Sequence, residues 1–347
     1  MTCALRLVAA AIGLACASSA TTPESPGPLP PSPAWVTISA EELRAGYDAI
    51  WAVSDVHGRL QEFDDLLVAA GLATRDGAGR VAWNPARRRQ LLVTVGDYID
   101  GGPDSVGVVL RVRELSEQAA AAGSRIVALL GNHEAAFLAY PSTAERSVLK
   151  DAHRRAAELG LPPRSRPSGD QLSRTEFGRF LRSLPAAGFV GTWLFAHSGY
   201  LDTRDDPGAV RALFSGIASR WGSDDAGRYR ALLDPWSILE CHNWWTSRRR
   251  RSAMRRRLAT LGLNGLVFGH DPDGLGVRRA IAIDSDGWLI KLDTGLKLGE
   301  SRGMLLRCEV AKVLQGTGLA MTTQGKPSCE AMTPDGRFEV VPTAPWR

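Results

Sequence analysis

Six side chains of the types that bind divalent metal ions stand within four residues of the end of a short apolar run. Imidazole, carboxylate and amide groups suit first-row divalent ions. Two such ions, about 3.5–4 Å apart, share a ligand such as a carboxylate, lower the pKa of a water and clamp phosphoryl oxygens. The sequence therefore contains the groups needed for a two-metal hydrolytic site. The candidate ligands are Asp55, His57, Asp97, Asn132, His197 and His270.

Five apolar runs position these residues, and their length and composition are typical of strands buried on both faces. Open α/β sheets gather ligand-binding residues at the carboxyl ends of their strands. We therefore expect the runs to bring the candidate ligands to one edge. The runs cover residues 49–53, 91–95, 126–130, 192–196 and 266–269.

Helical spacing of apolar residues over 60–72 and 106–122, between the expected strands, predicts a layered α/β fold. Residues 135–190 are rich in Arg and Pro, and we expect them to form a mostly helical insertion over the site. Four of the six histidines follow expected strands, a recurrence that single structural histidines do not explain. With three of them serving as ligands, His133 remains for proton transfer.

The motifs as a set resemble the calcineurin-like metallophosphoesterases, most closely the phosphoprotein-phosphatase branch and its bacterial Shewanella-like members. The resemblance covers about residues 46–310 and implies a layered β-sandwich of mixed sheets flanked by helices. A single histidine in the last motif, where other metallophosphoesterases often have two, agrees with the phosphatase branch. The motifs are Ser54–Gly58, Gly96–Gly102, Gly131–Glu134, Ala196–Gly199, Gly269–His270 and Leu289–Gly295.

The resemblance implies a role for each residue. Asp55 and His57 would hold the first metal, Asp97 would bridge both ions, and Asn132, His197 and His270 would hold the second. His133 would protonate the leaving alkoxide while Asp100 orients its ring, and Asn132 would also contact the substrate. The implied mechanism is in-line attack by a metal-bridging hydroxide. Mn, Fe, Zn and Co suit these ligands nearly equally.

One position departs from the phosphatase branch. An arginine that grips the phosphate usually follows the second Asp of the second motif, and here Gly101 stands there. Arg248, after the Trp-rich segment 244–245, resembles a second phosphate-gripping arginine of bacterial members; the alternative is an ordinary surface arginine.

The expected activity is hydrolysis of phosphomonoesters, with phosphoproteins as the first choice of substrate. A nucleotide or small-molecule phosphatase or phosphodiesterase is the alternative, and a non-catalytic binding protein on the same fold is a remote one. No sequence element of the form G-x-x-x-x-G-K-[ST] occurs, which argues against a P-loop protein driven by nucleotide hydrolysis.

The first twenty residues have the charged, apolar and small-residue layout of an export signal. Cleavage after Ala20 and lipidation at Cys16 are both open, and a lipid anchor would be the only contact with a membrane. We therefore expect an exported protein, periplasmic or extracellular. The expected organisation is a signal over 1–20, a Pro-rich linker over 21–45, the catalytic domain over 46–312 and a C-terminal extension over 313–347.

The net charge of +5 arises largely from arginines within residues 248–257. This run favours a solvated helix face over a nucleic-acid surface, so we do not expect a nucleic-acid partner. Three cysteines lie beyond the signal, Cys241, Cys308 and Cys329, and export would permit the last two to pair. No CxxC pair indicates a thiolate zinc site.

Overall fold

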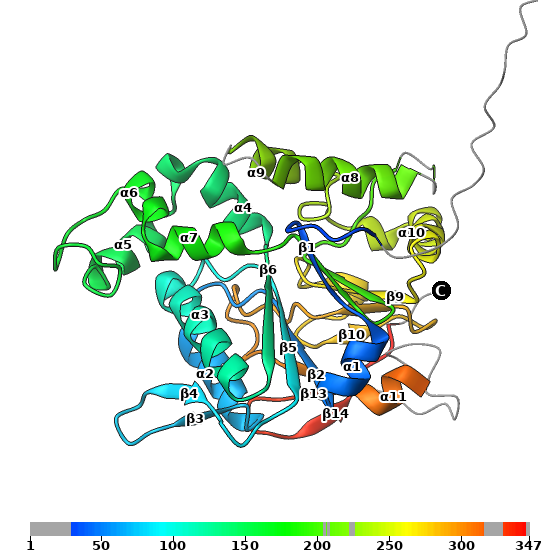
Figure 1. Ribbon diagram of the computed structural model, residues 1–347, viewed down its shortest axis with the longest axis horizontal. Helices are drawn as coiled ribbons and strands as arrows, with labels where there is room; N and C mark the ends of the chain where they lie inside the picture. The colour runs from blue at the N-terminus through cyan, green and yellow to red at the C-terminus, as the bar shows by residue number, and fades with distance from the viewer. Residues whose placement is uncertain (1–28, 204–205, 207–208, 222–225, 316–328, 345–347) are drawn as a thin grey trace, which may run out of the picture.

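The computed structural model describes residues 29–203, 206, 209–221, 226–315 and 329–344. Its centre is a sandwich of two mixed six-stranded sheets (Figure 1). In the first sheet the neighbours β2, β5 and β6 are parallel, and the remaining strands are antiparallel additions beside β2. Its order is β14 (Phe338–Val340), β13 (Cys329–Met332), β12 (Leu305–Glu309), β2 (Ala49–Val53), β5 (Gln90–Val95) and β6 (Arg125–Leu129).

The second sheet has the parallel strands β8, β9 and β11 at its centre. Strand β7 runs antiparallel to β8, and β1 is parallel to β7 at the edge. The order is β1 (Trp35–Ile38), β7 (Ala187–Val190), β8 (Trp193–Ala196), β9 (Gly265–Phe268), β11 (Leu289–Lys291) and β10 (Ala282–Ile283). A separate hairpin is formed by β3 (Ala73–Arg75) and β4 (Val81–Trp83).

Alternating side chains of the strands form two hydrophobic clusters. In β5, Leu91, Val93 and Val95 belong to the cluster that also contains Phe195 and Val267 of the other sheet. Because successive side chains of a strand point to opposite faces, Leu92 joins the other cluster, together with the helices. Both faces of the central strands are therefore covered, which explains why their sequences are apolar throughout.

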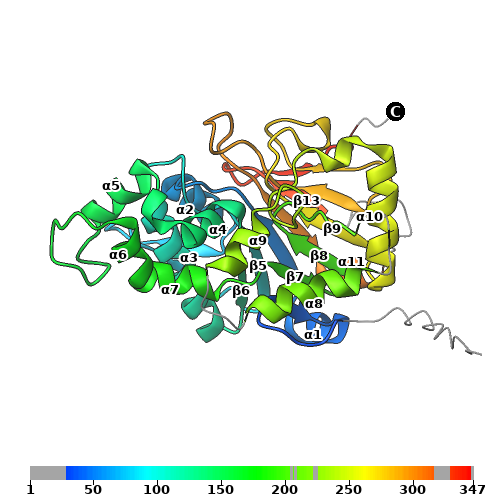
Figure 2. The same cartoon turned by 90° about the horizontal axis from the view of Figure 1, so that it is seen from above.

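Helices cover the outer faces of the sandwich. Seen from above, the group α4 to α7 lies on one side of the sheets and α10 on the other (Figure 2). The α-helices are α1 (Ala40–Gly46), α2 (Leu60–Ala69), α3 (Ser105–Ala121), α4 (Asn132–Ala139), α5 (Arg146–Arg154), α6 (Gly169–Arg174), α7 (Glu176–Ser183), α8 (Val210–Trp221), α9 (Gly227–Leu232), α10 (Arg248–Thr260) and α11 (Val310–Gln315). Short 3-10 turns are η1 (Pro141–Thr143), η3 (Trp244–Thr246) and η4 (Gly274–Gly276).

The ordered fold extends beyond the range expected for the catalytic domain at both ends. Strand β1 and all but the last residue of helix α1 lie within residues 21–45, which were predicted to be a linker. Strand β1 pairs with β7 along its whole length. Strands β13 and β14 lie within the predicted C-terminal extension and complete the first sheet. These strands have three or four residues each, too few for alternation to mark them in the sequence. Residues 1–20 lie outside the described part of the chain.

The segment 135–190 is mostly helical, as expected, because it contains most of α4 and all of α5, α6 and α7 before it ends in β7. Within the described residues, no helix has the length and apolar character that crossing a membrane requires.

Candidate functional site

The candidate ligands come from two sheets rather than one. Asp55, Asp97 and Asn132 follow β2, β5 and β6 of the first sheet, whereas His197 and His270 follow β8 and β9 of the second. In each sheet these strands are parallel, so their carboxyl ends point to the same edge. The sandwich therefore gathers the ligands where the edges of its two layers meet.

The loops that carry the ligands have unusual backbone conformations. Asp55, His57, Asp97, Asp100 and His270 all have positive φ angles, between 47° and 68°. Such angles are uncommon for residues with a side chain, and clusters of them occur where the surrounding structure holds a functional geometry. The loops thus turn sharply at the residues whose side chains must meet.

Glycine permits two of these loops to approach each other. A Cβ atom on Gly131 would lie 2.2 Å from Oδ1 of Asp97, and one on Gly269 would lie 2.2 Å from Oδ2 of Asp55. No side chain fits at such distances. Each glycine immediately precedes a candidate ligand, Asn132 or His270, so the close approach and the ligand are supplied by the same turn.

Asp97 occupies the centre of the cluster. Its Oδ2 atom lies 3.3 Å from Nε2 of His57 and 3.3 Å from Nε2 of His197. Two groups with ligand atoms close enough to hold an ion share this carboxylate: Asp97 with His57 and His133, and Asp97 with Asp55 and His197. A carboxylate between two donor sets is the arrangement that a pair of adjacent ions requires.

Backbone carbonyl groups fix the tautomers of His197 and His57, so that the Nε2 atoms of both rings point toward Asp97. Nδ1 of His197 lies 2.9 Å from the carbonyl oxygen of Val95, and Nδ1 of His57 lies 2.9 Å from that of Ile99. Since a carbonyl can only accept, each ring carries hydrogen on Nδ1, and the neutral ring directs the lone pair of Nε2 toward Asp97. Facing lone pairs repel one another unless a cation lies between them. The donor set therefore fits divalent metal ions.

Ligand atoms of Asn132, His197 and His270 also face one another. Oδ1 of Asn132 lies 2.9 Å from Nε2 of His197, which in turn lies 3.2 Å from Nδ1 of His270. The other ring nitrogen of His270 is 3.2 Å from the carbonyl oxygen of Glu240. These contacts bring together an amide oxygen and two imidazoles, again with their lone pairs facing one point.

Burial and the central carboxylate act in opposite directions on the candidate ligands. Burial lowers the pKa of His57 to about 4 and that of His270 to about 3, which keeps both rings neutral. Although burial opposes ionisation, the charges of His197 and His133 hold the pKa of Asp97 well below its usual range. Burial alone would lower the pKa of His197, but Asp97 raises it to about 10. The buried carboxylate of Asp97 is therefore stabilised by positive charge beside it, either a proton on His197 or a metal ion.

His133 and Asp100 form a pair at the edge of this cluster. Nδ1 of His133 lies 2.6 Å from Oδ2 of Asp100, and its Nε2 lies 3.8 Å from Oδ2 of Asp97. Burial lowers the pKa of His133, but Asp97 and Asp100 outweigh it and raise the pKa to about 9. The ring is half-buried, so it can reach both the cluster and a bound substrate.

Glu134 fixes the loop that carries Asp97. Its carboxylate accepts hydrogen bonds from the backbone N–H groups of Asp97, Tyr98, Ile99 and Gly131, at 2.8 to 3.1 Å. Its side chain is fully buried. The residue therefore joins the ends of β5 and β6, which supports the ligands without touching the position of an ion.

The sequence patterns did not indicate Lys297, which the structure brings to the site. Its Nζ atom lies 2.8 Å from Nε2 of His133. A Cβ atom on Gly101 would lie 2.9 Å from Cγ of Lys297, so the lysine stem fills the space beside that glycine. Lys297 is the second residue after the Leu289–Gly295 motif, and this was the only signal in the sequence.

The Trp-rich segment supports the last ligand loop. His242 stacks on His270 with ring centres 3.8 Å apart, and its Nδ1 atom lies 2.9 Å from Oδ1 of Asp271. Oδ2 of Asp271 accepts a hydrogen bond from Nε1 of Trp245 at 2.9 Å. Through this stacking, His242 and its hydrogen bond to Asp271 hold the orientation of His270.

Arg248 is not among the residues that the structure brings together in the cluster. It is exposed at the start of α10 and lines a separate pocket together with Arg255 and Asp286. Among the described residues, no hydrogen bond or ion pair joins it to the candidate ligands. Its part in phosphate binding stays a prediction.

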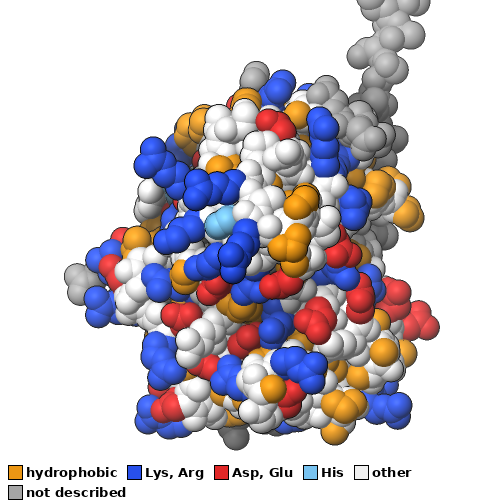
Figure 3. All heavy atoms as spheres, turned by 90° about the vertical axis from the view of Figure 1, so that its left-hand side faces the viewer, with side chains coloured by type: hydrophobic (Ala, Val, Ile, Leu, Met, Phe, Trp, Pro, Cys, Tyr) orange, Lys and Arg blue, Asp and Glu red, His pale blue; other side chains and the backbone are white. Residues whose placement is uncertain are grey.

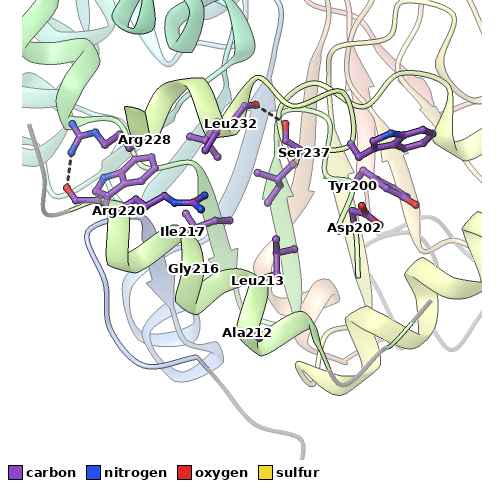
Figure 4. A pocket seen from close by; sticks show the side chains of 14 residues that line it. Tyr200, Asp202, Ala212, Leu213, Gly216, Ile217, Arg220, Arg228, Leu232 and Ser237 are labelled. Atoms are coloured by element: carbon purple, nitrogen blue, oxygen red, sulfur yellow. Dashed lines mark hydrogen bonds between the residues drawn. The ribbon is translucent and has the colours of Figure 1, made fainter. Parts of the chain in front are cut away.

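A further pocket, of about 250 Å³, lies beside α8 and α9 (Figure 4). Leu213, Ile217 and Leu232 contribute apolar side chains, and Oγ of Ser237 donates a hydrogen bond to the carbonyl oxygen of Leu232. None of the candidate ligands is among the described residues that line it, so this pocket is separate from the cluster.

Comparison with known proteins agrees with this geometry. The sequence pattern of the family described as calcineurin-like phosphoesterase matches residues 49–274, which include all six candidate ligands. An uncharacterized protein of Schizosaccharomyces pombe is 27% identical over 269 residues, covering 71% of this chain and 73% of the relative.

Two solved structures share the fold. A cold-active protein-tyrosine phosphatase of a Shewanella species superposes with a TM-score of 0.62 and 20% identity, covering 90% of this chain and 83% of the other. A protein serine/threonine phosphatase from Saccharomyces cerevisiae, with similarity to a human phosphatase, has a TM-score of 0.52 and 17% identity, covering 89% and 85%.

The chain belongs to the calcineurin-like phosphoesterase family. It is a metal-dependent hydrolase of phosphoric esters, and its sandwich of two mixed sheets flanked by helices is the fold expected from the sequence.

Proposed function

We propose that this enzyme hydrolyses phosphomonoesters at a centre of two divalent metal ions and that its substrates are phosphorylated proteins or peptides. The position of Asp97 carries the proposal. Its carboxylate lies 3.3 Å from a ring nitrogen on each side, one of His57 and one of His197, and it belongs to both candidate ligand groups. A second buried carboxylate, Asp55, completes one of these groups.

In this proposal Asp55 and His57 would hold the first ion, Asp97 would bridge both, and Asn132, His197 and His270 would hold the second. The converging lone pairs described above support this division. Two ions bound there would stabilise charge on the phosphoryl oxygens and lower the pKa of a water molecule to near neutrality. Mn, Fe, Zn and Co all suit the mixed nitrogen and oxygen donors.

The remaining chemistry belongs to the chain itself. His133 gives a proton from Nε2 to the leaving alkoxide, because Asp100 engages Nδ1 and fixes the ring. Asn132 would contact a phosphoryl oxygen in addition to serving as a metal ligand. Lys297 adds positive charge next to His133, where Gly101 offers no side chain of its own. Arg248 is retained as a second candidate for phosphate binding.

The choice of phosphoprotein substrates rests on the fold shared with two protein phosphatases. A panel of phosphotyrosine and phosphoserine peptides, nucleotides and bis(p-nitrophenyl) phosphate decides between the alternatives. Higher kcat/KM on peptides supports the proposal. Preference for nucleotides or for the diester would overturn it in favour of the second candidate function, a small-molecule phosphatase or phosphodiesterase.

The two-metal centre is tested by reconstituting the protein separately with Mn, Fe, Zn and Co and measuring bound metal and turnover of p-nitrophenyl phosphate. We expect two ions per chain. Asp97→Asn should lose metal and reduce turnover by at least about 10³-fold, since the bridge supports both ions. Asp286→Asn, at an exposed position, is the matched control. Unchanged metal content in Asp97→Asn would contradict the bridging role.

We also propose that the protein is exported, with either cleavage after Ala20 or lipidation at Cys16. The pairing of Cys308 with Cys329 in a disulfide supports this, because such bonds persist in oxidising compartments. Fractionation of the native host, with metabolic labelling by a palmitate analogue in wild type and Cys16→Ala, separates the two routes. Recovery of the intact precursor in the cytoplasm would contradict export.

A further inference from the structure

A basic pocket of about 430 Å³ opens beside the candidate metal centre. It lies on the face of the molecule that carries α5 and α6, where Lys and Arg side chains gather (Figure 3). Four of the residues that line it are cationic, and no carboxylate is among the described lining residues. The lining consists of Arg59, Gly101, Gly102, Pro103, Arg146, Ser147, Lys150 and Arg154.

The pocket and the metal centre share a wall. Gly101 lines the pocket and directly follows Asp100, the partner of His133. A Cβ atom at Gly101 would lie 3.7 Å from Cβ of His57, so the pocket wall at Gly101 lies next to a candidate metal ligand. Glu145, at the start of α5, has a carboxylate oxygen within 4.8 Å of ligand atoms of both Asp100 and His133. Helix α5 therefore begins at the reaction centre.

The cations of α5 form one stripe. Arg146, Lys150 and Arg154 are four residues apart, so they share a face of the helix. Arg154 is compensated by Asp104 at 2.8 Å and Asp151 at 3.0 Å. Neither Arg146 nor Lys150 forms an ion pair with any residue in the described part of the chain. Like charges at this spacing destabilise a helix, and a bound anion would offset their repulsion.

Arg59 lines the pocket together with the stripe. It follows the His57–Gly58 turn and precedes α2. Its Nε atom is buried and has no hydrogen-bond partner among the described residues, and its nearest carboxylate, Glu62, is 3.9 Å away. A buried N–H group without an acceptor is unfavourable, and an oxygen of a bound anion would satisfy it.

We infer that this pocket binds a second phosphate group of the substrate while the first is hydrolysed at the metal centre. Three cations with little local compensation surround a small space, and arginine forks match phosphate oxygens in geometry as well as charge. Gly101 lines the pocket and packs against the stem of Lys297, whose ammonium group reaches His133, so a substrate that spans both positions would pass along this lysine. The inference rests on the proposed function, because the scissile phosphate is assigned to the Asp97 centre.

The test compares substrates with one and two phosphates on the metal-loaded enzyme. The first arm uses phosphopeptides with a second phosphoserine placed one to four residues from the first, on either side, each matched with a serine peptide. The second arm uses fructose 1,6-bisphosphate against fructose 1-phosphate. Affinities are measured by calorimetry on metal-loaded His133→Asn, and kcat/KM on the active enzyme.

A second phosphate should improve Kd and kcat/KM by at least about tenfold in one of the two arms, and that arm identifies whether the source is a peptide or a small molecule. Arg146→Gln/Lys150→Gln should remove most of this advantage. Arg255→Gln/Arg256→Gln, which removes the same charge from the exposed face of α10, is the matched control and should retain it.

Equal affinity for one and two phosphates in both arms overturns the inference, as does an advantage that survives in Arg146→Gln/Lys150→Gln. These outcomes leave hydrolysis of singly phosphorylated substrates intact. Failure to hydrolyse any monoester in the panel would instead contradict the proposed function, so the two failures are distinguishable.

Discussion

The ammonium group of Lys297 lies 2.8 Å from Nε2 of His133, while Asp100 binds Nδ1 of the same ring at 2.6 Å. The imidazole is thus held between a positive and a negative group, one at each nitrogen. Asp100 favours the protonated ring and Lys297 opposes it. Together with burial, which lowers the pKa of His133, and Asp97, which raises it, these two neighbours set the pH range over which His133 can serve as a proton donor.

Replacing Lys297 by methionine should therefore raise the pKa of His133, because an opposing positive charge is removed. Activity that needs the protonated ring falls as pH rises through that pKa, so the alkaline limb should move to higher pH by about one unit. The pH profile of kcat/KM measures the shift. Lys297→Arg keeps the charge and should stay near wild type. An unmoved limb in Lys297→Met would mean that the contact has no influence on proton transfer.

His133→Asn should lower kcat by about 10²–10⁴-fold on alkyl phosphates while leaving two metal ions bound. The loss should be much smaller on p-nitrophenyl phosphate, because its leaving group departs with little need for a proton. Asp100→Asn should show the same dependence on the leaving group, since Asp100 acts through His133. Equal losses on both kinds of substrate would argue against the assignment of His133 as the general acid.

Gly131→Ala should disrupt the metal centre, because the added Cβ atom would lie 2.2 Å from Oδ1 of Asp97 and 2.3 Å from its backbone nitrogen. We expect a loss of bound metal together with a destabilisation of about 1–3 kcal/mol, measured by urea unfolding. Gly216→Ala on α8 is the control. Its Cβ meets no atom within 4 Å, and it should stabilise the protein by about 0.5–1 kcal/mol. Normal metal content in Gly131→Ala would refute the close approach.

The disulfide between Cys308 and Cys329 joins β12 to β13 across a sequence separation of 21 residues. Replacing both cysteines by serine should destabilise the fold by about 3 kcal/mol, chiefly by freeing the unfolded chain. Urea unfolding measures the change. Dithiothreitol should reproduce it in the wild type and have no effect on the double variant. A reductant effect in the variant would point to another cause.

Much of the site could be predicted from the sequence, for a physical reason. A strand buried on both faces has an apolar sequence, so the polar residue at its end stands out, and parallel strands bring such ends to one edge. This reasoning brought Asp55, Asp97, Asn132, His197 and His270 together correctly. It missed that they divide between two sheets, because short apolar runs carry no information on which strands pair.

What the sequence concealed depends on contacts between distant segments. Lys297 reaches His133 across 164 residues, and no periodic pattern links them. Strand β1 was hidden behind a Pro-rich segment, and β13 in a range expected to lie outside the domain. For Arg248 the only signal was its position after the Trp pair; its side chain lines a separate pocket, and its part in phosphate binding stays a prediction.

The origin of the ligands in two sheets has a thermodynamic consequence. Asp97 belongs to one layer of the sandwich and His197 to the other, so an ion held between them also fastens the layers together. Ligation is then linked to global unfolding: an ion present at 100 times its dissociation constant stabilises the native state by about 2.7 kcal/mol. The midpoint of thermal denaturation should rise with the concentration of free metal. A chelator should weaken the association of the two sheets at the edge where the ligands meet.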